Sequence, residues 1–223
     1  MTWQEYARAW SALHGGFDPE AAAPLIRGWV RLAYRGGSLL ARLGLTPGTV
    51  TLAGLLLCVV VPVATLAGPA GLIVAAVVVL AAGFADSFDG AVAVITGRAS
   101  RSGYVLDSVA DRIGEAAWLV AFWLAGAPGW LVVAAGAVSW LHEYVRARAT
   151  AAGMPDIGAV TVGERPTRVS VAVSGLLAGG VAGLVRPGWD DAVVTVAAAV
   201  WLALALVGLA QLAVVTRRAL RDA

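Results

Sequence analysis

The sequence contains no lysine and little charge of either sign. All 16 basic residues are arginine, and charged residues make up 13% of the 223 positions, whereas an average soluble domain has about 25%. Hydrophobic residues account for 60% of the chain. A chain of this composition cannot cover its own surface with polar groups, so we expect an integral membrane protein. The formal net charge of +2 is too small to indicate a nucleic-acid partner, and none is expected.

Cysteine is scarce as well. Cys58 is the only cysteine and lies within an apolar run, which excludes a disulfide bond within the chain. Acidic and basic residues such as Glu5, Arg8 and Asp18 interrupt the first 20 positions. No cleaved signal peptide is therefore expected, because such a peptide needs an uninterrupted apolar core.

Long apolar segments fill most of the remaining chain. A transmembrane helix needs about 20 mostly apolar residues. Short breaks rich in glycine and proline separate six candidates: 49–67, 69–93, 107–126, 129–150, 168–186 and 191–214. We therefore expect an all-α integral membrane protein with a catalytic domain of six transmembrane helices at 49–216. An N-terminal cytoplasmic segment (1–48) precedes it and a short basic tail (217–223) follows.

The arginines are distributed asymmetrically with respect to these six segments. Fifteen of the 16 lie before the first segment, after the last one, or at or beside the second and fourth connections, and only Arg186 lies on the other side. Connections rich in arginine remain in the cytoplasm. We therefore expect both termini and these two connections on the cytoplasmic side of the cell membrane.

The N-terminal segment 19–44 has a different pattern. Arg27, Arg31 and Arg35 recur at every fourth residue and share one face of a helix, while apolar residues occupy much of the remainder. This pattern is typical of an amphipathic helix on an anionic lipid surface, although a helix of a soluble domain can show it too. Thr46 and Pro47 then have the residue types of an N-cap and a first helical position.

Four aspartates flank the second connection: Asp86, Asp89, Asp107 and Asp111. Spacings of three and four place each pair on one face of its helix, and two helices joined by a short loop run antiparallel as neighbours. Ionised carboxylates at membrane depth need neutralisation. Their hard oxygen atoms favour Mg²⁺ or Mn²⁺, and two such ions would balance four charges and bind a substrate phosphate. Pairing with nearby arginines, or a pathway for cations, would also account for them.

The stretch DSFDGAVAVITGRASRSGYVLDSVAD, residues 86–111, resembles the signature of the CDP-alcohol phosphotransferase family, D-x-x-D-G-x-x-A-R-x8-G-x-x-x-D-x-x-x-D. Seven positions agree in type and spacing: Asp86, Asp89, Gly90, Ala93, Gly103, Asp107 and Asp111. The arginine of the signature falls on Val94, and Arg98, one helical turn further on, is a candidate substitute. The six apolar segments and the amphipathic helix before them fit the family too.

The resemblance implies a membrane enzyme that transfers a substituted phosphate, usually the phosphatidyl group of CDP-diacylglycerol, to an acceptor hydroxyl and releases CMP. It implies that the four aspartates hold two divalent ions, Mg²⁺ or Mn²⁺, and that Asp111 is also the general base. Gly90, Ala93, Arg98 and Gly103 are the implied nucleotide-binding residues. Family members are commonly homodimers, so membrane lipids and a second copy of the chain are expected partners.

A second basic group flanks the fourth connection. The stretches HEYVRARATAAG (142–153) and GERPTR (163–168) resemble segments of actinobacterial phosphatidylinositol phosphate synthases that bind the phosphate of the acceptor. The resemblance implies Arg146, Arg165 and Arg168 as acceptor-binding residues and inositol phosphate as the favoured acceptor. Anchoring at the membrane surface would also explain some of these arginines.

Three alternatives stay open. Glycerol 3-phosphate would satisfy the same arginines, as in a phosphatidylglycerophosphate synthase. The aspartates would suit a cation transporter, although all four are expected at one end of the bundle. Finally, Val94 at the signature arginine raises the alternative of a relative that keeps the fold without catalysis.

Overall fold

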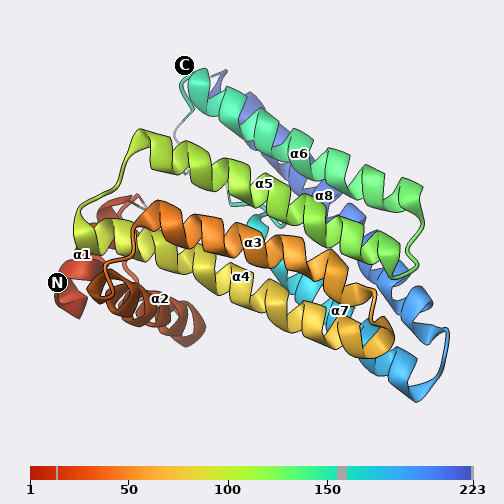
Figure 1. The fold of residues 1–223 in the computed structure, drawn as a ribbon. Coiled ribbons are helices and arrows are strands. Elements are labelled where there is room, and N and C mark those ends of the chain that lie inside the picture. Colours follow the sequence, from red (N-terminus) through yellow and green to blue (C-terminus); the bar gives the residue numbers. More distant parts are fainter. Residues whose placement is uncertain (14, 155–159, 222–223) are drawn as a thin grey trace. The chain divides into compact units, whose positions relative to one another are not determined.

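The computed structural model describes residues 1–13, 15–154 and 160–221, in which all regular structure is helical. The predicted all-α class is confirmed. The helices of this described part are shown in Figure 1: α1 (Trp3–Leu13), α2 (Pro24–Arg42), α3 (Pro47–Thr65), α4 (Gly68–Thr96), α5 (Arg101–Leu124), α6 (Gly129–Ala151), α7 (Arg165–Val185) and α8 (Trp189–Ala219). The end of the predicted basic tail, residues 222–223, lies outside the described residues.

The chain folds into two compact units. The first comprises Met1–Leu56 and Ala81–Asp111, and the second comprises Leu57–Leu80 and Arg112–Ala223. Helices α1 and α2 belong to the first unit, and α6, α7 and α8 belong to the second. Helices α3, α4 and α5 contribute to both.

Within the described residues, four helices are long and apolar enough to cross a membrane: α3, α4, α7 and α8. They coincide with four of the six predicted spans. The other two predicted spans, 107–126 and 129–150, fall in α5 and α6. These two segments are helical, but they do not meet the same criterion of length and apolar composition. Charged side chains such as Glu115 and Glu143 lie along these two helices, which lowers their apolar character.

Side-chain caps fix the starts of α3 and α5. Thr46 Oγ1 accepts a hydrogen bond of 3.2 Å from the backbone of Thr49 and caps α3, as the sequence predicts. Ser100 Oγ accepts one of 3.1 Å from the backbone of Gly103 and caps α5. Gly97, with φ of 65°, ends α4 in the left-handed conformation, and the chain then turns into α5.

In the first unit, two adjacent glycines bring α2 close to α4. A Cβ added at Gly37 would lie 2.5 Å from the Cβ of Ala91, and one at Gly36 would lie 2.5 Å from the ring of Phe88. Only glycine therefore permits this approach. The predicted amphipathic helix is confirmed as α2, and its buried face includes Val30.

Helix α1 was not among the predicted elements. An aromatic cluster joins it to α2: the ring centroids of Tyr6 and Tyr34 lie 5.2 Å apart, and those of Trp3 and Tyr34 lie 5.7 Å apart. The hydroxyl of Tyr34 donates a hydrogen bond of 2.9 Å to the carbonyl of Met1. Trp3 Nε1 donates one of 2.8 Å to the carboxylate of Glu20. These contacts dock α1 firmly on the first unit.

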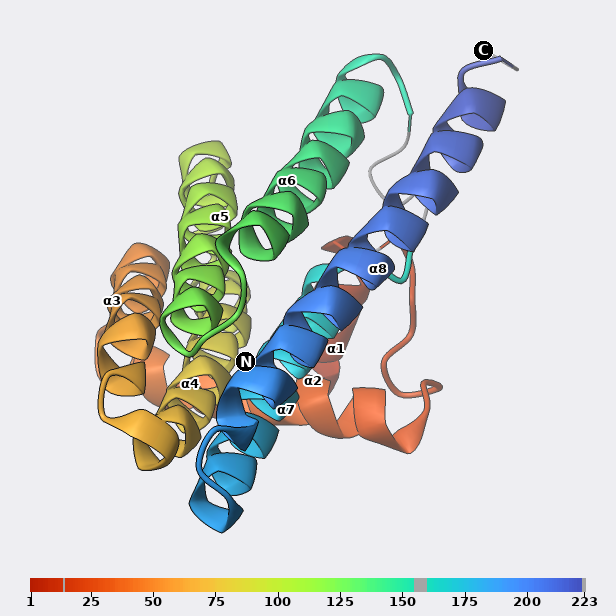
Figure 2. The same cartoon turned by 90° about the vertical axis from the view of Figure 1, so that its right-hand side faces the viewer.

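In the second unit, α7 and α8 form an antiparallel pair, and α8 also packs against α6 (Figure 2). Small residues on α7 permit this packing, because a Cβ added at Gly175 would lie 2.5 Å from the Cβ of Ala197 on α8. The core includes Phe122 and Trp201, whose rings meet edge to face at 6.3 Å. Trp201 Nε1 donates a hydrogen bond of 3.0 Å to Ser139, which satisfies its polar group inside the bundle.

Candidate active site

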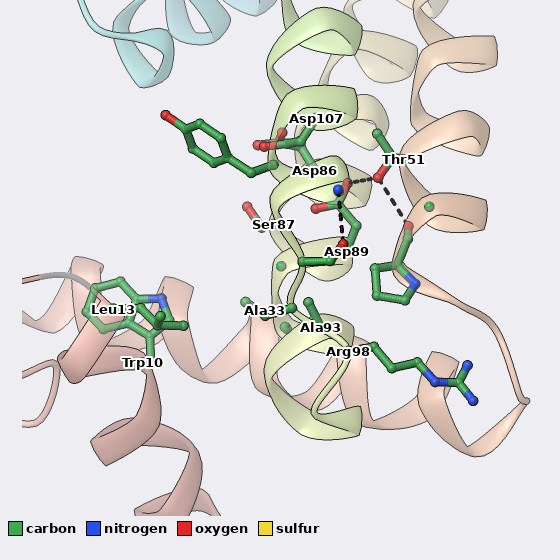
Figure 3. Close-up of a pocket in the computed structure, with 18 of the residues that line it drawn as sticks. Trp10, Leu13, Ala33, Thr51, Asp86, Ser87, Asp89, Ala93, Arg98 and Asp107 are labelled. Carbon is green, nitrogen blue, oxygen red and sulfur yellow. Dashed lines mark hydrogen bonds between the residues drawn. The ribbon is translucent and has the colours of Figure 1, made fainter. Parts of the chain in front are cut away.

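Three of the predicted aspartates meet in the first unit. Asp86 and Asp89 come from α4 and Asp107 from α5, and one carboxylate oxygen of each lies within 4.8 Å of the other two. The spacing of three places the first two on one helix face, and the capped turn between α4 and α5 brings the third beside them. Such a set of oxygen ligands suits a hard divalent cation such as Mg²⁺ or Mn²⁺. Figure 3 shows the three side chains converging at the upper part of the cavity.

Asp89 is the most buried of the three, with 6% of its surface exposed. Its Oδ2 accepts a hydrogen bond of 2.6 Å from the hydroxyl of Thr51 on α3. Thr51 is itself buried, so the contact is shielded from solvent. Sequence reasoning missed Thr51, and no signal in its local sequence distinguishes it from the other threonines of α3.

Asp111, the fourth predicted ligand, follows Asp107 by one helical turn on α5 and is half-buried. The described group of three clustered carboxylates does not include it. Its part in metal binding, and its part as general base, stay predictions.

The aspartates lie at the wall of a cavity of about 770 Å³, within the usual size range of ligand sites. All four residues predicted to bind the nucleotide line this cavity: Gly90, Ala93, Arg98 and Gly103. A Cβ added at Gly90 would meet no described atom within 4 Å, so the backbone there is open to the cavity. The side chain of Arg98 extends away from the aspartates in Figure 3.

Helix α1 supplies a part of the cavity wall that sequence reasoning missed. Tyr6, Trp10 and Leu13 line the cavity, as does Trp29 of α2. Burial raises the pKa of Tyr6 to about 12, so its phenol stays neutral even at a pH where an exposed tyrosine ionises. The spacing of aromatic residues in WQEYARAW could have predicted this helix face.

Val94, which stands at the signature arginine, lies half-buried on α4. It packs against a buried cluster that includes Tyr6 of α1, Val30 of α2 and Ala91 of α4. A guanidinium at this position would have to enter an apolar environment, which is costly. The valine is therefore explained by the docking of α1 and α2 on this part of α4.

The predicted acceptor-binding arginines belong to the second unit, and two of them pair with glutamates. Arg146 of α6 forms an ion pair with Glu164, which immediately precedes α7. Oε1 of Glu164 also accepts hydrogen bonds of 3.0 Å from both the backbone and the hydroxyl of Thr161. The Thr161 hydroxyl lies 2.9 Å from Nε2 of the buried His142. Arg165 is the first residue of α7.

Arg168 is enclosed by acidic side chains. Its Nη1 lies 3.1 Å from both carboxylate oxygens of Glu115, and its Nη2 lies 3.0 Å from Oε1 of Glu143. The side chains of Arg168 and Glu115 are only 3% and 1% exposed. Arg112 completes the group, at 3.0 Å from Glu115 and 3.3 Å from Glu143. The network ties together α5, α6 and α7.

Known proteins share both the sequence pattern and this fold. A family model described as CDP-alcohol phosphatidyltransferase matches residues 44–211. The chain belongs to this family. The matched range contains the three clustered aspartates, Gly90 and the arginines of the second unit, and it excludes α1. This phosphatidyltransferase is thus an enzyme integral to a membrane, and its clustered aspartates suit a divalent metal.

Two relatives illustrate the range of similar sequences. The phosphatidylinositol phosphate synthase of Mycolicibacterium smegmatis is 37% identical over 156 residues, which cover 66% of this chain and 68% of the relative. The archaetidylinositol phosphate synthase of Methanothermobacter thermautotrophicus is 34% identical over 159 residues, which cover 71% of this chain and 78% of the relative.

Solved structures of phosphatidylinositol phosphate synthase from Mycobacterium tuberculosis are similar to the structure of this chain. The crystal structure with CDP-DAG bound gives a TM-score of 0.66 at 27% identity, covering 83% of this chain and 94% of that one. The crystal structure in complex with manganese and citrate gives a TM-score of 0.66 at 26% identity, covering 83% of this chain and 88% of that one.

Proposed function

We propose that this phosphatidyltransferase transfers the phosphatidyl group from CDP-diacylglycerol to the hydroxyl of a small phosphorylated acceptor, with inositol phosphate favoured, and releases CMP. The observation that carries the proposal is the group of three clustered aspartates beside the open backbone of Gly90, in one cavity. The names of the similar proteins support both the donor and the acceptor.

The aspartates are proposed to form a divalent metal site. Asp86, Asp89, Asp107 and Asp111 would hold Mg²⁺ or Mn²⁺, and two ions would balance their charge. When bound, such ions spread the negative charge of a diphosphate and of the transferring phosphoryl group. Burial of Asp89 and its hydrogen bond from Thr51 keep one carboxylate in a fixed orientation for this task.

Asp111 is proposed as the general base. Its carboxylate would take the proton of the acceptor hydroxyl, whose oxygen forms a bond to the phosphorus of the phosphatidyl group. The bond from that phosphorus to the bridging oxygen breaks, and CMP leaves with that oxygen. A base must come within about 3 Å of the hydroxyl in the substrate complex.

The nucleotide would lie against the small residues of α4. Gly90 and Ala93 leave space for it, and Arg98 and Gly103 line the same cavity. Arg98 would supply a cation beside the nucleotide, in place of the arginine for which the chain has Val94.

Arg146 and Arg165, with Arg168, are proposed to bind the phosphate of the acceptor, since guanidinium groups suit a phosphate dianion. Arg168 has the least access to a ligand, because Glu115 and Glu143 engage it inside the second unit. Glycerol 3-phosphate is the second candidate acceptor, because the same arginines would bind its phosphate.

Six membrane-spanning helices, with both termini and the active site on the cytoplasmic side, complete the proposal. The distribution of the arginines supports this orientation. Residues 1–48 would form the cytoplasmic segment and 217–223 the tail. Two copies of the chain would associate as a homodimer.

A transfer assay with CDP-diacylglycerol and a panel of labelled acceptors tests the function. We expect incorporation of inositol phosphate or glycerol 3-phosphate into lipid, with one CMP released for each lipid formed. Incorporation of serine or choline, which carry no phosphate, would contradict the role of the arginines.

A further inference from the structure

One face of α1 forms a wall of the cavity that contains the aspartates. Tyr6, Trp10 and Leu13 are spaced by four and three residues, so their side chains share that face. Figure 3 shows Trp10 and Leu13 on one side of the cavity and Ala93 on the other. The wall therefore combines aromatic and aliphatic groups with the small residues of α4.

This wall is held in place by contacts that lie outside the cavity. Trp3 donates its hydrogen bond to Glu20, and Tyr34 donates to the carbonyl of Met1. The guanidinium of Arg31 lies over the ring of Trp3, at 5.3 Å from its centroid. These residues fix the position of α1 without lining the cavity, and they remain when the side chain of Trp10 is changed. Trp10 itself packs against the cluster around Tyr6, and its ring lies 6.2 Å from that of Phe17, so Trp10→Phe is the variant that best preserves the docking.

Val94, which replaces the arginine of the signature, lies where α1 docks on α4. Val94 contacts the cluster that contains Tyr6, and Tyr6 is only 1% exposed. One turn of α4 thus presents Ala93 to the cavity and Val94 to the aromatic cluster. In this chain, the signature's arginine position is a valine that packs against a cluster that includes Tyr6 of α1.

We propose that α1 forms the binding surface for the base of the nucleotide, with Trp10 as the contact residue and Tyr6 as the anchor of the helix. The inference rests on the proposed function, because it assigns the nucleotide to this cavity. Every nucleobase has a flat π-face that stacks on an aromatic side chain. The aspartates would hold the metal that binds the charged end of a nucleoside diphosphate, and the α1 wall binds its uncharged planar end.

The test compares two probes that share the diphosphate but differ in the nucleoside. CDP and inorganic pyrophosphate are titrated, each with Mg²⁺, into the purified full-length protein in detergent, and affinities are measured by calorimetry. Trp10→Ala removes the aromatic ring, Trp10→Phe retains one, and Arg8→Ala changes an exposed residue of the same helix as a control.

We expect Trp10→Ala to weaken CDP binding about tenfold or more and to leave pyrophosphate binding within about twofold, since stacking involves the base alone. Trp10→Phe retains most of the affinity for CDP, and Arg8→Ala behaves as the wild type. An unchanged affinity of Trp10→Ala for CDP would overturn the inference. An equal loss of both probes would overturn it as well, since that pattern indicates general disruption of the site.

Failure of the inference about α1 can be distinguished from failure of the proposed function. Selective loss of CDP binding in Trp10→Ala supports the inference even if no acceptor is converted to lipid. If the wild-type protein binds pyrophosphate but not CDP, the base has no binding surface and the inference fails. If it transfers phosphatidyl groups normally while Trp10→Ala binds CDP as tightly as wild type, only the inference fails.

Discussion

The hydroxyl of Thr51 on α3 donates a hydrogen bond of 2.6 Å to Oδ2 of Asp89 on α4. Asp89 is 6% exposed and Thr51 is 7% exposed, so water does not compete effectively for this contact. Hydrogen bonds to a carboxylate are stronger than those between neutral groups, and partners that orient a metal ligand affect metal affinity. Thr51 is thus a determinant of the acidic site that lies outside its sequence signature.

Replacing Thr51 with valine should weaken metal binding. The change keeps the volume of the side chain but leaves Asp89 without its donor, and loss of such a partner typically costs about 10–100-fold in metal affinity. The Mn²⁺ concentration that gives half-maximal activity measures the effect. Thr51→Ser, which retains the hydroxyl, serves as the matched control. A metal dependence of the valine variant equal to that of both the serine variant and the wild type would remove Thr51 from the site.

Asp111→Asn should abolish turnover while leaving CDP-diacylglycerol binding largely intact. The amide cannot accept the proton of the acceptor hydroxyl, whereas the three clustered carboxylates are unchanged. Asp89→Asn is the comparison variant, and it should weaken both binding and turnover. Turnover and equilibrium binding of the CDP-lipid should be measured side by side. Full turnover by Asp111→Asn would end the assignment of the base.

The sequence predicted the clustered aspartates better than it predicted the residues that line the cavity beside them. Period and composition identified the helices from α2 onward. The spacing of the four aspartates predicted that they converge, and the structure shows this for Asp86, Asp89 and Asp107. Helix α1 was missed because it is short and amphipathic, with none of the apolar length that marks a membrane span. Trp10 was therefore missed as a residue of the cavity wall.

The arginines illustrate a different limit of sequence reasoning. Motif spacing identified Arg146 and Arg168 as a basic group, but it could not indicate which glutamates would pair with them. Glu115 and Arg168 are 53 positions apart, so their contact depends on tertiary packing of α5 against α7. Similarly, the sequence alone does not explain why Val94 replaces the arginine of the signature, because the reason lies in its packing against the cluster that includes Tyr6.

Arg146→Ala should raise the KM for the phosphorylated acceptor, with little change in the KM for CDP-diacylglycerol. A guanidinium that binds phosphate makes a charge-assisted contact worth about 1.5–3 kcal/mol, equivalent to at least about tenfold in KM. Arg148→Ala is the matched control, because Arg148 is exposed on the same helix two residues away. Equal effects of the two variants would indicate that charge alone, and not a specific contact, is responsible.

Arg168→Met should destabilise the second unit strongly. The variant leaves Glu115 and Glu143 with less compensation inside the fold, and breaking a buried ion pair typically costs about 3–5 kcal/mol. Thermal unfolding in detergent measures the loss. The double variant Arg168→Met with Glu115→Met should recover part of it, because the buried carboxylate, which then has only Arg112 as a cationic partner in the group, is removed too.

An unfolding temperature equal to that of the wild type would contradict the structural role of Arg168. A raised KM for the acceptor in the same variant would then support its proposed role in acceptor binding alone. Measuring both quantities on the same preparation separates a structural arginine from a ligand-binding one.

The most direct test of the central claim is metal-dependent release of CMP from CDP-diacylglycerol by the purified protein, with inositol phosphate as acceptor. We predict that CMP and the lipid product form in equal amounts with Mg²⁺ or Mn²⁺, and that EDTA or the Asp89→Asn change abolishes both. Absence of CMP release in the presence of either metal and both candidate acceptors, or release that persists in EDTA, would contradict the account.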